Sequence, residues 1–298
     1  MTCFSPLNGF LPVSGGKLQS VDRGDCRPVS VPCRQCIGCR LDRSRDWAVR
    51  CVHEAQIASE SCFVTLTYAD EFVPRSLTHS HFQLFMHRLR KRLKRSVRFY
   101  MSGEYGERTL RPHYHACLFG YSFLDDRVYY RKSPAGSRLY RSDLLDSVWG
   151  MGLCSIGELT FESAAYAARY ITKKVTGDAA SEHYSRVDVE TGEVYEVLPE
   201  YSKMSLRPGL GAEWARRYMR DCLPRDYCVI DGRKWPVPDY YVELMRREGG
   251  WYDLAEVEHE RFKRSCEPEV QADSTPERLA VREACARAAL SFKSRDLE

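Results

Sequence analysis

Two strand-like segments joined by a short, turn-rich link are the feature of this sequence that most constrains its fold. Residues 97–102 and 114–121 are rich in aromatic and other apolar side chains, which favour strands. The link, residues 103–112, contains two glycines and ends in proline, so it is typical of a turn and too short for a crossover helix. The two strands are therefore expected to be antiparallel neighbours.

The segments around this strand pair predict a fold of the α+β class. Residues 61–68 combine aromatic and β-branched side chains and predict a buried strand. Apolar positions spaced by three or four residues predict helices over 42–59 and 161–175, and a third that begins at Thr78 or Ser80. Further elements are expected as a hairpin over 187–197, a strand pair within 227–237, and surface helices over 240–248 and 276–292, with only a weak pattern in 122–160.

Composition divides the chain into three expected parts. Residues 1–40 are rich in Gly, Pro, Ser and Cys and have little periodicity, which indicates a loop-dominated segment that needs a staple such as a metal ion. Residues 41–225 carry the strands and helices of one core, and residues 226–298 form a partly helical C-terminal extension. A chain of 298 residues with 43% apolar content can bury one substantial core with a smaller module attached.

Charge in this chain is concentrated rather than abundant. The net charge of +4 does not by itself indicate a polyanionic partner, but residues 87–95 form a dense basic block, suited either to phosphate binding or to a solvated helix face. A secretory signal and a membrane-length apolar stretch are both missing, so a cytosolic location without a membrane partner is expected. The sequence also lacks a phosphate-binding loop, so no fused ATPase is expected.

The run Arg111-Pro-His-Tyr-His115 gives the strongest local indication of chemistry. Side chains two apart on a strand share a face, so His113 and His115 would project together and could bind one divalent cation. Glu104, at the end of the preceding strand, could reach the same face of an antiparallel pair. Such a set leaves coordination positions open for phosphate oxygens and water, as Lewis-acid catalysis on a phosphodiester requires. The alternative is a pair of unrelated histidines.

A second indication of chemistry lies in the helix expected over residues 161–175. Tyr166 and Tyr170 would stand one turn apart on one face, with Lys173 one further turn along, on or beside it. A tyrosine phenolate can attack phosphorus and conserve the energy of the broken DNA bond in a covalent link, and a nearby cation favours the phenolate. The alternative is a pair of core tyrosines with only their hydroxyls exposed.

A third cluster, Cys33-Arg-Gln-Cys-Ile-Gly-Cys39, has spacings that suit tetrahedral zinc. Thirteen cysteines without a secretion signal favour metal binding or simple burial over a disulfide framework. Because Cys33, Cys36 and Cys39 supply only three ligands, a fourth is needed. We prefer Cys3 for this position; the other candidates are Cys26, Cys51 and His53.

Seven motifs together resemble the replication initiators of microviruses, in particular those of gokushovirus-type single-stranded DNA phages, which are rolling-circle endonucleases of the His-hydrophobe-His class. The resemblance covers about residues 1–240. The motifs are, in order, Cys3-Phe-Ser-Pro-Leu7, Val31-Pro-Cys-Arg-Gln-Cys-Ile-Gly-Cys-Arg40, Arg43-Ser-Arg-Asp-Trp-Ala48, Phe63-Val-Thr-Leu-Thr-Tyr68, Ser102-Gly-Glu-Tyr-Gly106, Arg111-Pro-His-Tyr-His115 and Tyr166-Ala-Ala-Arg-Tyr-Ile-Thr-Lys173.

The resemblance implies a central antiparallel sheet flanked by helices. It implies a Mg²⁺ or Mn²⁺ ion on His113, His115 and Glu104, with Glu107 as the second choice for the carboxylate. One tyrosine would cleave the origin strand, become linked to the 5′ phosphate and free a 3′ hydroxyl for host polymerase. The other would cleave the regenerated origin so that the strand closes into a circle. Expected partners are single-stranded or supercoiled origin DNA and the host helicase and polymerase, in the cytoplasm of a bacterial host.

Two other functions fit the same sequence features. The first is a plasmid initiator or a transposase of the same nuclease class, which the cysteine motifs make less expected. The second is a non-catalytic, zinc-stapled DNA-binding protein whose basic helix contacts phosphates. Formation of a covalent protein–DNA adduct would separate the catalytic functions from the non-catalytic one.

Overall fold

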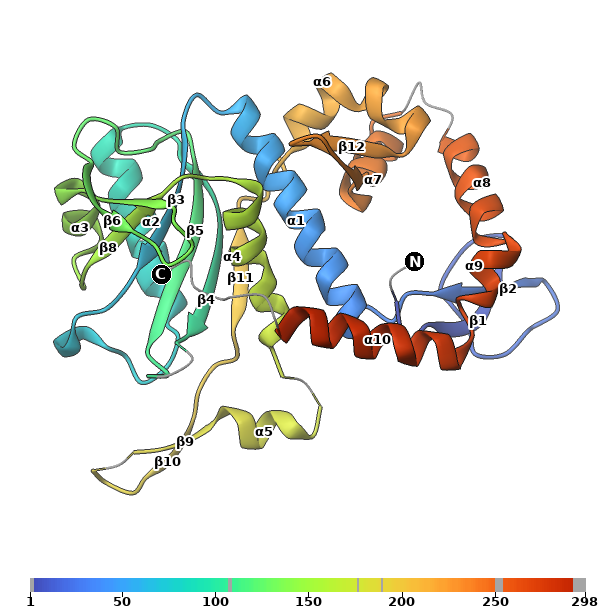
Figure 1. The fold of residues 1–298 in the computed structure, drawn as a ribbon, viewed down its shortest axis with the longest axis horizontal. Helices are drawn as coiled ribbons and strands as arrows, with labels where there is room; N and C mark the ends of the chain where they lie inside the picture. The colour runs from blue at the N-terminus through green and yellow to red at the C-terminus, as the bar shows by residue number, and fades with distance from the viewer. Residues whose placement is uncertain (1–2, 107–108, 176, 189, 250–253, 292–298) are drawn as a thin grey trace. The chain divides into compact units, whose positions relative to one another are not determined.

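The chain divides into two compact units, one formed by Met1–Arg43 with Ala255–Arg295 and the other by Ser44–Leu254 with Asp296–Glu298. The three-part division expected from composition stays a prediction. Figure 1 shows the elements of both units. The structure, a computed structural model, describes residues 3–106, 109–175, 177–188, 190–249 and 254–291.

The larger unit is built on a seven-stranded antiparallel sheet in the order β11-β4-β5-β3-β8-β7-β6 (Figure 1). The strand pair expected from the sequence lies within it: β4 and β5 pair antiparallel from Arg98↔Phe119 to Tyr105↔Pro112. The expected α+β class, with a central antiparallel sheet and several helices, is confirmed. The strands are β3 (Ser61–Leu66), β4 (Arg98–Tyr105), β5 (Pro112–Phe119), β6 (Val128–Lys132), β7 (Arg138–Arg141), β8 (Cys154–Gly157) and β11 (Tyr201–Met204).

Helices cover both faces of the sheet and create two separate apolar layers. On one face, α2 and α3 bury Phe82 and Trp149 against Tyr114 of β5. On the other face, α4 and part of α1 pack against Phe63 and Cys117. Side chains alternate along each strand, so Tyr114 and its neighbours at 113 and 115 point to opposite faces. The helices are α1 (Ile37–Ile57), α2 (His79–Leu93), α3 (Asp143–Trp149) and α4 (Phe161–Lys173).

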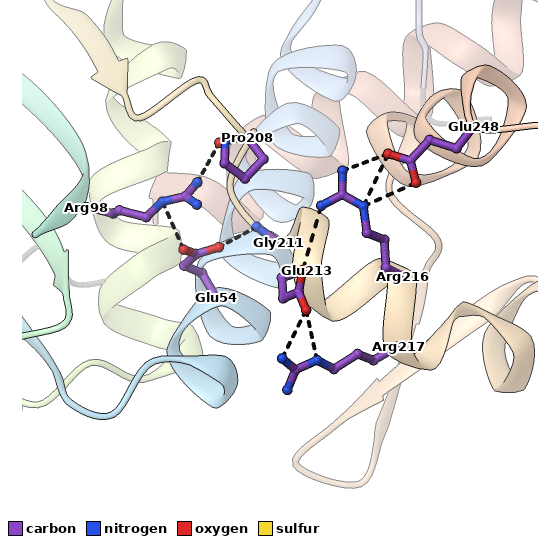
Figure 2. A network of polar contacts seen from close by, with 8 residues as sticks. All are labelled: Glu54, Arg98, Pro208, Gly211, Glu213, Arg216, Arg217 and Glu248. Atoms are coloured by element: carbon purple, nitrogen blue, oxygen red, sulfur yellow. Dashed lines mark hydrogen bonds and ion pairs between the residues drawn. The ribbon is translucent and has the colours of Figure 1, made fainter. Parts of the chain in front are cut away.

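A third apolar cluster joins helices α6 and α7 to the hairpin of β12 and β13, which forms where the sequence predicted a strand pair. A polar network fixes the start of α6: Glu54 of α1 accepts the backbone N–H of Gly211 at 2.8 Å and pairs with Arg98 at 3.1 Å (Figure 2). Gly211 has φ +78°, and a Cβ there would lie 2.1 Å from Tyr241 Oη, so only glycine fits. The elements are α6 (Ala212–Cys222), β12 (Tyr227–Ile230), β13 (Arg233–Pro236) and α7 (Asp239–Arg247).

A hairpin arm connects α4 to the edge strand β11. β9 and β10 pair antiparallel where the sequence predicted a hairpin, and Arg75 forms ion pairs with Asp188 and Glu193 in the arm. The elements of the arm are α5 (Ala179–Tyr184), β9 (Ser185–Val187) and β10 (Val194–Glu196), and two short 3-10 helices lie elsewhere at Asp70–Phe72 and Leu223–Arg225.

The smaller unit has a small apolar core formed by Phe4, Ile37 and Leu279. Its first part differs from the loop-dominated segment expected there, because β1 and β2 pair antiparallel over six positions. Most side chains of this hairpin are partly or fully exposed on both faces, so no alternating apolar pattern marks it in the sequence. The elements are β1 (Leu7–Pro12), β2 (Cys26–Val31), α8 (Leu254–Ser265), α9 (Pro268–Ala272) and α10 (Pro276–Ser291).

None of the described helices in either unit combines the length and the apolar character needed to cross a bilayer.

Candidate metal and nucleophile site

A buried group of two histidines and one glutamate lies on the face of the sheet that α4 covers. The pairing of β4 with β5 places Glu104 opposite His113, and His115 follows two residues along on the same face. The Nε2 atoms of both histidines converge on Glu104 Oε1, at 2.7 Å from His113 and 2.9 Å from His115. All three residues are at most 6% exposed. We call these three residues the His–Glu group.

The second nitrogen of each imidazole ring also has a partner. His113 Nδ1 lies 3.2 Å from the carbonyl oxygen of Arg111, and His115 Nδ1 lies 3.0 Å from Thr65 Oγ1. Because a carbonyl oxygen only accepts, the proton of a neutral His113 ring belongs on Nδ1, which leaves the lone pair of Nε2 facing Glu104. This is the arrangement by which proteins orient histidine ligands toward a metal.

The donor set of the His–Glu group fits a divalent cation. Its three ligand atoms lie within 4.8 Å of one another. Two imidazole nitrogens and one carboxylate oxygen are ligands that divalent first-row metals accept, and three ligands leave further coordination positions open. His113, His115 and Glu104 are therefore the residues that would hold a catalytic ion.

Glu104 remains a carboxylate in this environment. Burial by itself raises the pKa of Glu104, but the hydrogen bonds from His113 and His115 and their positive charge outweigh burial and leave this pKa below its ordinary value. A carboxylate that stays ionised in the protein interior is suited to balance the charge of a cation.

Helix α4 brings Tyr166 to the His–Glu group. The helix begins with a capping box in which Thr160 and Ser163 bond each other's backbone N–H groups. Small, fully buried alanines at 164, 167 and 168 let the helix pack closely on the sheet. The Tyr166 ring is 7% exposed and meets the His115 ring edge-on, with centroids 5.1 Å apart at an interplanar angle of 82°. A phenol therefore lies directly beside the candidate metal ligands.

Three other residues singled out in the sequence lie outside the described part of the structure. Tyr170 and Lys173 belong to α4 by their backbone, but their side chains are not described. Glu107, the second choice for the carboxylate ligand, lies outside the described residues altogether.

Two polar residues of the site could not be assigned from local sequence patterns. Thr65 faces His115 because β3 pairs with β5 at that register. Ser102 lies opposite His115 on β4, is fully buried, and its hydroxyl has no hydrogen-bond partner among the described residues. Strand alternation places Ser102 in phase with Glu104 and is the one sequence feature that points to it.

Cys3, Cys33, Cys36 and Cys39 form a second group of candidate metal ligands, in the smaller unit. Their four sulfur atoms lie within 4.8 Å of one another. The backbone N–H groups of Cys33 and Phe4 donate to the sulfurs of Cys3 and Cys36, each at 3.3 Å, and the N–H of Cys36 donates to Cys33 Sγ at 3.2 Å. Four thiols with amide donors around them suit a closed tetrahedral zinc site. We call these residues the cysteine group.

The environment of the cysteine group also favours ionisation of one thiol. Burial raises the pKa of Cys33, but N–H donors from Cys36 and Gln35 outweigh burial and bring this pKa to about 7. Of the other candidates for the fourth ligand, His53 lies elsewhere: its Nδ1 is 3.1 Å from Tyr241 Oη and its ring stacks on Trp214.

Comparison with known proteins connects this site to phage replication. A family model of replication-associated proteins, the ORF2 family, matches residues 61–175, which run from β3 through α4. Replication-associated protein ORF2 of Spiroplasma virus 4 is 33% identical over 291 residues, covering 89% of this chain and 86% of that protein. The chain belongs to this family of phage replication-associated proteins. The resemblance to microvirus replication initiators that its motifs indicated is thereby confirmed.

Two more members of the family are similar over most of this chain. VP4 of Bdellovibrio phage phiMH2K is 29% identical over 259 residues, which is 83% of this chain and 78% of that protein. ORF4 of Chlamydia phage 1 is 27% identical over 226 residues, 73% of this chain and 54% of that protein. No solved structure matches the chain. The segment matched by the family model contains the His–Glu group and Tyr166 and does not include the cysteine group.

Proposed function

We propose that this replication-associated protein is an initiator endonuclease that nicks one strand of the phage origin and later rejoins it. The observation that carries the proposal is the Tyr166 ring packed edge-on against His115, a member of a buried group with metal-ligand chemistry. A phenol, two imidazoles and a carboxylate in one place are the parts that transesterification of a phosphodiester needs. Rolling-circle nuclease chemistry explains why a replication protein would bury them together.

In the proposed reaction a tyrosine oxygen attacks the scissile phosphorus. A bond forms between that oxygen and the 5′ phosphate, the bond to the 3′ oxygen breaks, and the phenol proton leaves, so that a free 3′ hydroxyl results. When bound by His113, His115 and Glu104, a Mg²⁺ or Mn²⁺ ion supplies Lewis-acid polarisation of the phosphate. The buried ring of Tyr166 has few orientations open to it, which reduces the entropy lost in placing its oxygen.

We assign the rejoining step to the reverse reaction. The phosphotyrosine bond keeps the energy of the cleaved phosphodiester, so a 3′ hydroxyl can attack it and release the tyrosine without an added energy source. Tyr166 and Tyr170 lie four residues apart on α4, which suits alternation: one tyrosine holds the first 5′ end while the other cleaves after one round of synthesis. Lys173 is assigned to stabilise the phenolate by its charge.

We assign zinc to the cysteine group and a structural role to that ion. Four thiolates leave no open position for a substrate, which distinguishes this group from the His–Glu group. The expected partners are single-stranded or supercoiled origin DNA and, for extension of the 3′ end, the helicase and polymerase of the bacterial host, in whose cytoplasm the protein would act.

Covalent capture tests the proposed function. Purified protein with Mn²⁺ and a labelled single-stranded oligonucleotide from the phage origin should give a protein–DNA adduct that survives denaturing electrophoresis. EDTA should abolish the adduct, and so should the double substitution Tyr166→Phe with Tyr170→Phe. Tyr218→Phe on α6, which removes a phenol from an exposed tyrosine, is the matched control and should leave the adduct unchanged. An adduct that persists in the double variant would overturn the assignment of the nucleophiles.

A further inference from the structure

The hairpin of β6 and β7, residues 127–141, has an unusual composition for the edge of a sheet. It contains five cations and no carboxylate. All five residues of β6 are exposed, and Tyr129 and Tyr130 are each 54% exposed. Figure 1 shows β6 at the edge of the larger unit's sheet, opposite to β11 in strand order. Exposed aromatic side chains next to several cations are the combination found on surfaces that bind nucleic acid.

The cations of this hairpin are available for an anionic partner. Arg141 pairs with Asp146. Within the described part of the chain, no carboxylate forms an ion pair with the other four cations, which are Arg127, Arg131, Lys132 and Arg138. Elsewhere in the larger unit exposed arginines such as Arg216 and Arg217 are paired with glutamates, so the hairpin differs from the rest of the surface. Unpaired cations near one another attract phosphates at little cost in broken ion pairs.

A β-bulge presents Tyr130. The register between β6 and β7 shifts between Tyr129 and Arg131, so Tyr130 has no partner on β7. The guanidinium groups of Arg131 and Arg141 lie 5.8 Å and 5.7 Å from the centre of the Tyr130 ring. Bulges on edge strands re-aim side chains, and an aromatic ring supported by guanidinium groups can stack on a base.

We propose that this hairpin binds single-stranded DNA, with bases stacked on Tyr129 and Tyr130 and phosphates held by Arg131, Lys132 and Arg138. Charges on an edge strand also prevent it from pairing with other chains, but that role needs no exposed tyrosines. Stacking requires base faces that are free, so single strands suit this surface better than a duplex, which offers mainly its phosphates.

The position of the hairpin relates it to the proposed nicking site, and this part of the inference rests on the proposed function. Strands β3, β8 and β7 separate β6 from β5, which carries His113 and His115. Four strand spacings of about 4.8 Å put the hairpin roughly 19 Å from that strand. At about 3.4 Å per nucleotide, the bound bases would lie roughly six nucleotides from the scissile phosphate.

A binding measurement in EDTA tests the hairpin without catalysis. Fluorescence anisotropy with a labelled 20-nucleotide oligothymidine should show that the pair Tyr129→Ala and Tyr130→Ala binds roughly 10- to 100-fold more weakly than the wild type. The matched pair Tyr129→Phe and Tyr130→Phe keeps both rings and should bind within about twofold of the wild type. The alanine pair should bind duplex DNA within about twofold of the wild type, because phosphate contacts are retained.

Two outcomes overturn the proposal: wild-type affinity of the alanine pair for the oligothymidine, or an equal loss for single strands and duplex. Charge variants provide a second readout. Arg131→Gln, Lys132→Gln and Arg138→Gln together should reduce the slope of log affinity against log salt by about two, whereas the alanine pair should leave this slope unchanged.

The adduct assay separates this inference from the proposed function. An adduct formed by the wild type together with unchanged oligothymidine binding by the alanine pair would remove the hairpin proposal alone. A wild type that forms no adduct but loses oligothymidine binding in the alanine pair would leave the hairpin as a DNA-binding surface. It would then overturn the link between the hairpin and a nicking site.

Discussion

The cysteine group and the His–Glu group can both hold a metal ion, but they offer it different surroundings. The cysteine group has four sulfur ligands, which complete a tetrahedral shell around zinc. The His–Glu group has two nitrogens and one oxygen, which leave coordination positions open. Tyr166 lies beside the open group.

The amount of apolar core around each group differs as well. The smaller unit, which contains the cysteine group, has a core of only three buried apolar residues, Phe4, Ile37 and Leu279. The His–Glu group lies on a seven-stranded sheet with a large apolar layer on each face. An ion in the first site would therefore contribute mainly to folding, and an ion in the second mainly to chemistry. The following substitutions separate these two roles.

The largest effect is expected from His113→Ala. Losing one of three ligands should reduce the rate of nicking at least about 100-fold, measured with a labelled origin oligonucleotide. The zinc content of the protein, measured by mass spectrometry, should not change. His183→Ala, an exposed histidine on α5, is the matched control and should nick like the wild type. Unchanged nicking by His113→Ala would show that the His–Glu group is not the catalytic centre.

The next largest effect is expected from Cys36→Ser, and it should fall on stability. Structural zinc supplies roughly 10–16 kcal/mol of binding energy that becomes folding energy, so its loss should unfold the smaller unit and open it to limited proteolysis. Bound zinc should fall by about one ion per chain. Cys266→Ser changes an exposed cysteine of the same unit and should retain the zinc. A Cys36→Ser protein that keeps its zinc and its protease resistance would contradict the structural role.

A smaller effect is expected from Thr65→Val. The substitution removes the hydroxyl that bonds His115 Nδ1 at 3.0 Å, and such partners of metal ligands typically contribute 10- to 100-fold to affinity or activity. Titration with Mn²⁺ should therefore give a dissociation constant about 10-fold higher, while saturating Mn²⁺ restores much of the nicking. In the control Thr67→Val the lost hydroxyl bonds the carbonyl of Leu153 instead of a histidine. An equal loss in both variants would mean that the Thr65 hydroxyl does not orient His115.

The smallest expected effect distinguishes two ions at the same site. Imidazole nitrogens bind Mn²⁺ better than Mg²⁺, which prefers oxygen ligands, so half-maximal nicking should need about tenfold less Mn²⁺ than Mg²⁺. Neither ion should displace zinc from the four sulfurs of the cysteine group. Equal requirements for the two ions would mean that the histidines are not ligands.

Local patterns predicted much of the sheet and of the His–Glu group. His113 and His115 share a face because strand side chains alternate, and Glu104 joins them because its strand is the antiparallel neighbour across a short link. These relations need only short-range information. The same holds for the amphipathic helices α2 and α4 and for the hairpin of β9 and β10.

Long-range pairing and exposed strands could not be predicted from the sequence. β11 joins the sheet by pairing Ser202 with Ser102, and no local pattern specifies a partner so far along the chain. β6 escaped detection because every one of its side chains is exposed, which leaves no apolar alternation. Thr65 acquires its place beside His115 only through the register of β3 with β5. The roles of Tyr170 and Lys173 stay predictions.

Mapping of the covalent adduct tests the central claim most directly. Trypsin cleaves after Arg141, Arg169 and Lys173, so the two tyrosines fall on separate peptides, 142–169 and 170–173. After nicking with Mn²⁺ and digestion of the DNA, mass spectrometry should find nucleotide mass on one or both of these peptides and on no other. Nucleotide attached elsewhere, or a nicked strand without any attached protein, would contradict the proposal that a tyrosine of α4 is the nucleophile.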